Sequence, residues 1–194
     1  MKTRLQLESE RVLAVEGKDE VSFFEALLKH ERIEGIQLLD IGGKDKFAHT
    51  LPALVNQDGF SQVHTIGFVR DAEELQADSA FASVCHALAS NALPVPPAIN
   101  TVFHEDARRT GIFIMPNNVE AGMLEDLCLE SVRDEPVFDC VEQYIACCLQ
   151  DRSFHVPKAK VQSFLSIQNP SVTSLGLGAL KGYWNFQHDC FNGI

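Results

Sequence analysis

Short apolar runs alternate with longer helical segments over about the first 120 residues, and this alternation limits the fold more than any other feature. The apolar runs are typical of strands and lie at 12–15, 36–43, 63–69, 100–106 and 110–116. Apolar residues recur at helical spacing between them, in the segments 19–33, 44–57 and 79–93. Strands that alternate with helices form βαβ units, so the sequence predicts an α/β fold with a mainly parallel sheet flanked by helices.

The sequence leaves two details of this pattern open: the effect of a proline in one helical segment and the pairing of the last two strands. Pro52 lies inside the second helical segment, where a proline typically breaks or bends a helix. The last two strands form either a hairpin through residues 107–110 or a separate edge strand and central strand. Both arrangements agree with the apolar pattern.

From Met123 onward the pattern changes to helices with no strands between them. The predicted helical segments are 123–132, 137–150 and 157–168. We therefore divide the chain into a Rossmann-like α/β core at 1–122 and a helical C-terminal extension at 123–194, packed on the core as one compact unit. Trp184, the single tryptophan, is expected to pack against the C-terminal helix rather than to stack on a base.

Composition limits the classes of function. The chain has 27 acidic residues against 16 lysines and arginines, which gives a formal net charge of −11. Proteins that bind nucleic acid through bulk electrostatics present a basic face, so this balance argues against that class. It leaves room for an enzyme whose clustered acids are neutralised by bound cations.

The sequence lacks two kinds of segment that would direct a protein to a membrane or out of the cell. The N-terminal residues MKTRLQLESER lack the apolar core of a signal peptide, and no run approaches the roughly 18 apolar residues of a membrane span. We expect a cytoplasmic, soluble protein with no membrane partner. The six cysteines form no Cys-x-x-Cys pair, so reduced and buried thiols are expected rather than disulfides.

Acidic residues follow the ends of three predicted strands. Glu16 ends the first, Asp40 lies at the end of the second, and Asp71 follows the third. Ligands bind beyond the carboxyl ends of strands in an open parallel sheet, so we expect Glu16 and Asp71 at one edge. Asp71 and Glu73 also form an acid-x-acid pair at a tight turn. Converging carboxylates repel unless a hard cation such as Mg²⁺ lies among them. Each acid alone is better explained as a cap, so the metal site rests on the combination.

A glycine pair follows the second strand. Gly42 and Gly43 permit a tight turn whose amides face an anion, and Lys44 lies beside them, so these three residues are candidate phosphate contacts. The stretch is not a Walker A motif, because the spacing and the hydroxyl residue are absent. A solvated lysine at a helix start is the alternative interpretation.

Other charged residues are assigned to structural or solvated roles. Asp19 and Glu20 lie in the first turn of a helical segment, where acids suit the helix dipole. The arginines at 108–109 lie in a predicted turn, and Lys158 and Lys160 flank an apolar helix. Any of these cations would serve as a phosphate contact, with solvated surface as the default.

Three stretches, "VLAVEGKDE", "DIGGKDKF" and "IGFVRDAEE", resemble the Toprim domain in their order and in their placement at strand ends. This domain occurs in topoisomerases, bacterial primases, recombination proteins and the OLD (overcoming-lysogenization-defect) nucleases. With "GIFIMPNNVEAGMLEDLCLES" and "PKAKVQSFLS", the chain looks closest to an uncharacterised bacterial group of Toprim-like proteins related to those nucleases. The resemblance to that group covers almost the whole chain and implies a Rossmann-like Toprim core.

The resemblance implies a metal site for Mg²⁺ or Mn²⁺. Toprim domains carry a Glu at the end of the first strand, which Glu16 matches, and there it is also the implied catalytic acid or base. They carry an Asp-x-Asp pair after the third strand, where Asp71 matches and Glu73 departs by one methylene. Glu125 in "MLEDL", with Asp126 as the alternative, corresponds to a further metal-binding acid of the nuclease relatives.

The function implied by the resemblance is a Mg²⁺-dependent nuclease or phosphodiesterase that acts on DNA or RNA in repair or phage defence. The alternative is a non-catalytic Toprim-like module that binds a metal, a nucleotide or a partner such as an ATPase. A receiver-like signalling domain is the third hypothesis, although "TGIFIMPNN" lacks the lysine that receivers need after a late strand. Topoisomerases need a tyrosine nucleophile, whereas the apolar helical contexts of Tyr144 and Tyr183 favour a core role.

Overall fold

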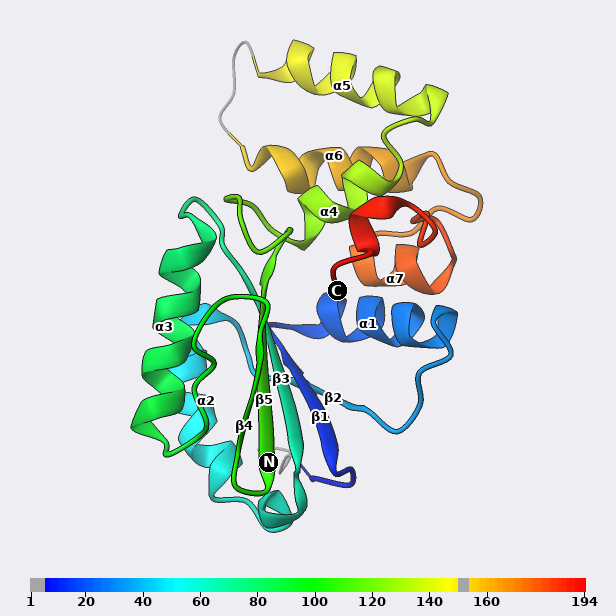
Figure 1. The fold of residues 1–194 in the computed structure, drawn as a ribbon. Coiled ribbons are helices and arrows are strands. Elements are labelled where there is room, and N and C mark those ends of the chain that lie inside the picture. Colours follow the sequence, from blue (N-terminus) through cyan, green and yellow to red (C-terminus); the bar gives the residue numbers. More distant parts are fainter. Residues whose placement is uncertain (1–5, 150–153) are drawn as a thin grey trace.

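The computed structural model describes residues 6–149 and 154–194, and a five-stranded sheet forms its centre (Figure 1). The strands are β1 (Arg11–Val15), β2 (Gln37–Asp40), β3 (Thr65–Asp71), β4 (Val102–Glu105) and β5 (Arg108–Met115). Their order is β2-β1-β3-β5-β4, with parallel pairing except between β4 and β5. The predicted α/β fold with a mainly parallel sheet is confirmed, and the last two strands form a hairpin.

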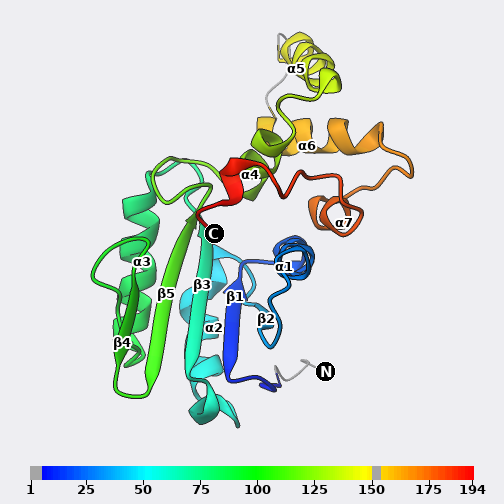
Figure 2. The same ribbon diagram turned by 45° about the vertical axis from the view of Figure 1, so that its right-hand side comes forward.

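Helices lie on both faces of the sheet and beyond one of its edges. They are α1 (Lys18–His30), α2 (Lys44–Val55), α3 (Ala77–Ser90), α4 (Leu124–Ser131), α5 (Pro136–Cys148), α6 (Val156–Ser166) and α7 (Leu175–Leu180), with 3-10 turns at Phe60–Gln62 and Asp189–Phe191. Helices α2 and α3 cover one face, and α1 covers part of the other (Figures 1 and 2). Helices α4, α5 and α6 stack beyond the carboxyl ends of the strands. Within the described ranges, no helix has the length and apolar character needed to cross a bilayer.

Two hydrophobic clusters, one on each face, hold the sheet between the helices. Along β3, Ile66 and Phe68 belong to the cluster under α2 and α3, whereas Val69 belongs to the cluster on the α1 side. All three side chains are buried. Burial on both faces explains why the strands of the parallel part read as nearly continuous apolar runs.

The helical C-terminal third shares the cluster on the α1 side. Phe164 of α6 and Trp184 of the tail belong to the same cluster as Val15 and Val69 of the sheet. Trp184 stacks on Phe164 with ring centroids 5.4 Å apart, and its Nε1 donates to the Leu175 carbonyl at 3.0 Å. Trp184 therefore packs among the C-terminal helices, as predicted. The division at residue 122 stays a prediction.

Helix α2 does not end at its proline. Pro52 lies inside the helix, which continues to Val55. A proline removes one backbone hydrogen bond from a helix interior. Leu51 and Leu54, both buried in the core, keep the residues around Pro52 against the sheet, so burial outweighs this local loss.

The arginines at 108–109 lie in β5, not in the predicted turn. The Arg108 guanidinium lies 4.4 Å from the centroid of the Phe60 ring. It also donates hydrogen bonds to the carbonyl oxygens of Val63 and Phe60, at 3.0 and 3.1 Å. Arg108 therefore fastens the start of β5 to the segment before β3, and these contacts occupy the group that would meet a phosphate.

Helix α5 is more exposed than predicted. Tyr144 is 60% exposed, and Cys140 and Cys147 are exposed as well, so the expected burial of these three side chains is wrong. Helix α5 is the outermost helix of the stack (Figure 1), and it buries Val141 and Ile145 on its inner side. The apolar residues on its other side therefore meet solvent. All six cysteines are free, as predicted.

Helices α1 and α7 come close together at a glycine. A Cβ on Gly176 would lie 2.6 Å from the carbonyl oxygen of Asp19 and 2.7 Å from the Cβ of Ser22. The Gly176 N–H donates to Asp19 Oδ1 at 3.3 Å. Asp19 therefore connects α1 to α7, in addition to its place in the first turn of α1.

We expect Gly176→Ala to lower the free energy of unfolding by about 1–3 kcal/mol, because the new methyl group would overlap backbone atoms of α1. Glycine-to-alanine changes inside helices usually stabilise by up to about 1 kcal/mol, so a loss would identify the close contact. Denaturant unfolding followed by circular dichroism measures the difference. Gly193→Ala is the matched control, because its added methyl group meets nothing within 4 Å. Equal stability of Gly176→Ala and the wild type would contradict the expectation.

Candidate functional site

The candidate site lies where the strand order reverses. Strand β1 has β2 on one side and β3 on the other, and the helices that follow β1 and β3 lie on opposite faces of the sheet (Figure 2). Connections that leave in opposite directions open a crevice beyond the carboxyl ends of the two strands. Glu16 directly follows β1, and Asp71 is the last residue of β3.

The structure brings Glu16 and Asp71 together, as their strand positions predicted. The backbone N–H of Asp71 donates to Glu16 Oε1 at 3.2 Å. The Glu16 side chain is 16% exposed, and its Oε1 lies 3.8 Å from Nε of Arg70, whose side chain is 14% exposed. A half-buried carboxylate thus bridges the ends of two neighbouring strands and has a cation beside it.

Arg70 is a neighbour of the site that the sequence did not identify. Its NH1 group donates to the Ser83 hydroxyl of α3 at 3.1 Å, while its buried Nε has no hydrogen-bond partner among the described residues. Successive residues of a strand point to opposite faces, so Arg70 points toward α3 and Asp71 toward α4. The alternation of side chains along the strand, which can be read from the sequence, could have placed Arg70 on the α3 side.

Asp71 connects the sheet to the first turn of α4. Its Oδ1 accepts a hydrogen bond from the Leu124 N–H at 3.1 Å. Burial raises the pKa of the Asp71 carboxyl well above its ordinary value, and the negative charges of Glu16, Glu20 and Glu125 raise it further. The Leu124 N–H lowers the pKa and does not offset these effects.

Glu125 and Glu20 complete the acidic cluster, which we define as Glu16, Glu20, Asp71 and Glu125. Burial raises the pKa of Glu125, although Lys158, with Nζ 4.0 Å from Glu125 Oε1, lowers it. Burial also raises the pKa of Glu20, and the charges of Glu16 and Glu125 add to this effect. The cluster therefore draws its four carboxyl groups from the end of β1, the start of α1, the end of β3 and the start of α4.

The sequence assigned Glu20 only to the start of a helix. A Cβ on Gly17 would lie 3.0 Å from Glu20 Oε2, so the Glu20 side chain folds back over the turn that follows Glu16. Four residues separate Glu16 from Glu20. The start of a helix directly after the strand is the signal that places both carboxyl groups near the same turn.

Glu73 holds the loop after β3 through its main chain. Its N–H donates to the Gly122 carbonyl at 2.7 Å, and the Gly122 N–H donates to the Glu73 carbonyl at 2.8 Å. Its φ of 57° is in the left-handed region that few residues other than glycine adopt. A metal-binding role for Glu73 stays a prediction.

The glycine pair after β2 uses its amides inside the protein. The Gly42 N–H donates to Asp40 Oδ1 at 2.8 Å, and the Gly43 N–H donates to the Glu16 carbonyl at 2.6 Å. Both glycines have positive φ, 85° and 78°, which the turn before α2 requires. The side chain of Lys44 lies outside the described part of the structure. The phosphate contacts of Gly42, Gly43 and Lys44 stay a prediction. In this structure the amides of Gly42 and Gly43 donate hydrogen bonds to acceptors within the protein.

The acidic cluster offers oxygen donors but is not a preformed metal site in the described residues. Among residues 6–149 and 154–194, no three His, Cys, Asp or Glu side chains are already arranged to hold one metal ion. Mg²⁺ commonly takes only one or two carboxylates and completes its shell with water and substrate oxygens. The cluster fits a hard divalent cation by its donor chemistry, because a cation would offset the repulsion that raises the Asp71 pKa.

A known structure shares this fold. A hypothetical protein from Pyrococcus horikoshii OT3 superposes with a TM-score of 0.61 at 18% identity, over 89% of this chain and 87% of that chain. The C-terminal region of the Xanthomonas campestris pv. campestris OLD protein gives a TM-score of 0.40 at 15% identity, over 97% of this chain and 88% of that chain. None of the curated proteins matches the sequence. The model of the family "Protein of unknown function (DUF3226)" matches residues 10–194, and the chain therefore belongs to this family.

Proposed function

We propose that the protein is a Mg²⁺- or Mn²⁺-dependent phosphodiesterase of the Toprim type that acts on nucleic acid. One observation carries the proposal: half-buried carboxyl groups of the acidic cluster converge at the switch point of a parallel sheet, where burial and the charges of its neighbours raise the pKa of Asp71. Repulsion among these carboxyl groups opposes folding when they are ionised. Perturbed carboxyl groups in such a position are typical of a functional site.

The chemistry of the proposal divides between the side chains. Asp71 and Glu125 supply oxygen donors from two elements that the Leu124 hydrogen bond holds together. A divalent cation, when bound, would polarise a phosphoryl oxygen and lower the pKa of a water molecule. Glu16 is the proposed general base or acid, and Arg70 beside it would hold its carboxylate in position.

The Toprim pattern supports this proposal through placement. Glu16 and Asp71 occupy the strand ends that the Toprim resemblance assigns to its first two acids. In the proposal Glu125 is the third acid, at the start of α4. Lys158, 58% exposed and with Nζ 4.0 Å from Glu125 Oε1, is the proposed phosphate contact, whereas Lys160 Nζ lies 2.6 Å from Glu142 Oε1.

A non-catalytic module that binds metal, nucleotide or a partner is the second candidate. The observation that favours it is Glu73, which stands where the Toprim pattern has aspartate and whose main chain pairs with that of Gly122 in a left-handed conformation. Calorimetric titration with Mg²⁺ and Mn²⁺ distinguishes the candidates when it is combined with a cleavage assay. Metal binding without cleavage supports the module, and metal binding with cleavage supports the enzyme.

We expect Glu16→Gln and Asp71→Asn each to reduce metal-dependent cleavage of DNA or RNA by roughly 100-fold or more, because each removes a charge on which the proposed reaction depends. Each amide keeps an oxygen that can accept the hydrogen bond now made by Asp71 N–H or Leu124 N–H, so the local fold should survive. Glu31→Gln, at an exposed position after α1, is the matched control. The proposal fails if no cleavage is seen with either metal, or if both variants cleave as well as the control.

We expect Asp71→Asn to raise the melting temperature in metal-free buffer near neutral pH. Asp71 has a folded-state pKa above its ordinary value of 3.8, so its ionisation opposes folding and stability falls as pH rises through the folded-state pKa. The neutral amide of the variant does not ionise and so keeps this stability. In a chain of this size, each kcal/mol gained raises the melting temperature by about 2–4 °C.

The pH dependence and the metal dependence provide the check. The difference between Asp71→Asn and wild type should vanish at pH values below 3.8, where aspartate is protonated in both states. Saturating Mg²⁺ should stabilise the wild type more than the variant, because binding to the folded state adds to its stability. A variant that melts below the wild type in metal-free neutral buffer would show that the Asp71 charge is stabilised locally.

A further inference from the structure

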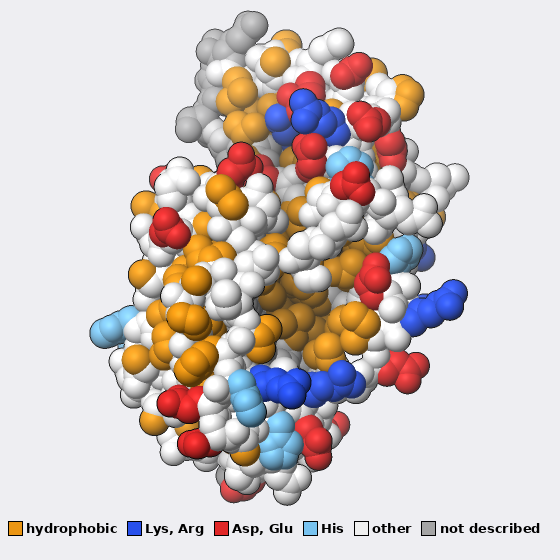
Figure 3. Space-filling model, in the orientation of Figure 1, with side chains coloured by type: hydrophobic (Ala, Val, Ile, Leu, Met, Phe, Trp, Pro, Cys, Tyr) orange, Lys and Arg blue, Asp and Glu red, His pale blue; other side chains and the backbone are white. Residues whose placement is uncertain are grey.

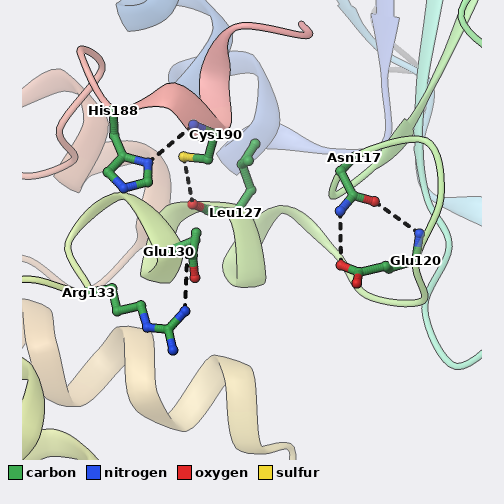
Figure 4. A network of polar contacts seen from close by, with 7 residues as sticks. All are labelled: Asn117, Glu120, Leu127, Glu130, Arg133, His188 and Cys190. Atoms are coloured by element: carbon green, nitrogen blue, oxygen red, sulfur yellow. Dashed lines mark hydrogen bonds and ion pairs between the residues drawn. The ribbon is translucent and has the colours of Figure 1, made fainter.

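A large groove lies among the C-terminal helices, apart from the acidic cluster. Its volume is about 1120 Å³. Its walls come from the loop after β5, from α4 and the turn after it, from α5, from the start of α6 and from Cys190. Figure 4 shows polar contacts of its lining: Asn117 Nδ2 donates to Glu120 Oε2 at 2.9 Å, and Cys190 Sγ lies 3.8 Å from the Leu127 carbonyl.

Carboxylates predominate among the charged groups that line the groove. The acidic side chains are Glu120, Asp126, Glu130, Asp134, Asp139 and Glu142. The cations of the lining are Arg133 and Lys160, and each lies close to one of these carboxylates: Arg133 NH1 is 3.5 Å from Glu130, and Lys160 Nζ is 2.6 Å from Glu142. Acidic side chains gather around the few basic ones on the helices beyond the sheet (Figure 3). The groove therefore carries an excess of negative charge.

Apolar side chains lie between these carboxylates. Leu127 and Leu129 of α4 are buried in the groove wall, while Phe138 of α5 and the Val156–Pro157 start of α6 are half-buried. Half-buried apolar side chains in a hollow leave apolar surface for a partner to cover. A purely hydrophilic cation would satisfy the charges and leave this surface in water.

The two properties together specify the occupant. Phosphate groups would meet repulsion from the carboxylates, which disfavours a nucleic acid here. A cationic amphipathic helix matches both: its apolar stripe would meet Phe138 and its neighbours, and its lysines or arginines would face Asp134 and Asp139. We propose that this groove is the docking site for a cationic amphipathic segment of a partner protein.

The docking site is separate from the acidic cluster, although both use α4. Glu125 belongs to the cluster and raises the pKa of Asp71, whereas the adjacent Asp126 lines the groove. The proposal therefore does not depend on the proposed phosphodiesterase activity. A protein without any cleavage activity would keep the groove.

The test uses labelled synthetic helical peptides of about 18 residues, roughly 27 Å long as a helix, and fluorescence anisotropy. The first peptide presents leucines on one face and lysines on the other. The second replaces lysine with glutamate, and the third replaces leucine with serine. We expect the first peptide to bind the wild-type protein at least about tenfold more tightly than either of the others. Only the first peptide offers both cations for the carboxylates and leucines for the apolar side chains of the groove.

Two matched double variants locate the binding. Asp134→Lys with Asp139→Lys reverses two exposed charges of the groove, and Glu31→Lys with Glu34→Lys reverses two exposed charges on the loop after α1. Both change the net charge equally. We expect the groove variant to weaken binding of the first peptide about tenfold and the control to weaken it less than about twofold.

Several outcomes would overturn the proposal. Equal weakening by both double variants would show attraction to the net charge of −11 rather than to the groove. If the serine-containing peptide bound as tightly as the first peptide, the apolar side chains of the groove would have no part in binding. A single-stranded oligonucleotide that binds the wild type and is affected only by the groove variant would make the groove a nucleic-acid site instead.

Discussion

The hydrogen bond from the Leu124 N–H to Asp71 joins the central strand of the sheet to the helices beyond its carboxyl edge. Asp71 is the last residue of the central strand β3, and Leu124 is the first residue of α4, so this 3.1 Å contact sets the helical stack against the carboxyl edge of the sheet. The paired main chains of Glu73 and Gly122 support it from the loop beside it. The position of Glu125, one residue further along α4, follows from this junction.

The same junction carries an electrostatic cost. Leu124 N–H lies at a helix N-terminus, where a negative charge is favoured, yet burial and three neighbouring carboxylates raise the pKa of Asp71 well above its ordinary value. Arg70 beside Glu16 and Lys158 beside Glu125 offset part of the repulsion from outside the centre of the cluster. An apolar residue at position 71 would avoid the cost but would leave the Leu124 N–H without this acceptor, so the same carboxyl group both joins β3 to α4 and destabilises the junction when it is ionised.

The sequence predicted much of the sheet and part of the acidic cluster. Alternating strands and helices indicate parallel βαβ units, and in such units Glu16 and Asp71 reach the same edge whatever the details of packing. Glu20 was missed because acids in a first helical turn have an ordinary explanation, and only the packed structure shows its carboxyl acting on Asp71. Tyr144 was misplaced because an apolar helical pattern does not reveal that α5 is the outermost helix.

The acidic groove was beyond sequence reasoning for a related reason. Its walls come from segments separated by up to about seventy residues, and none of them has a distinctive motif on its own. Adjacent residues of α4 meet different surroundings: Glu125 acts on Asp71, and Asp126 lines the groove while its Oδ2 accepts the Met123 N–H at 2.9 Å. A segment bound in the groove would therefore contact the same helix turn whose first N–H holds Asp71.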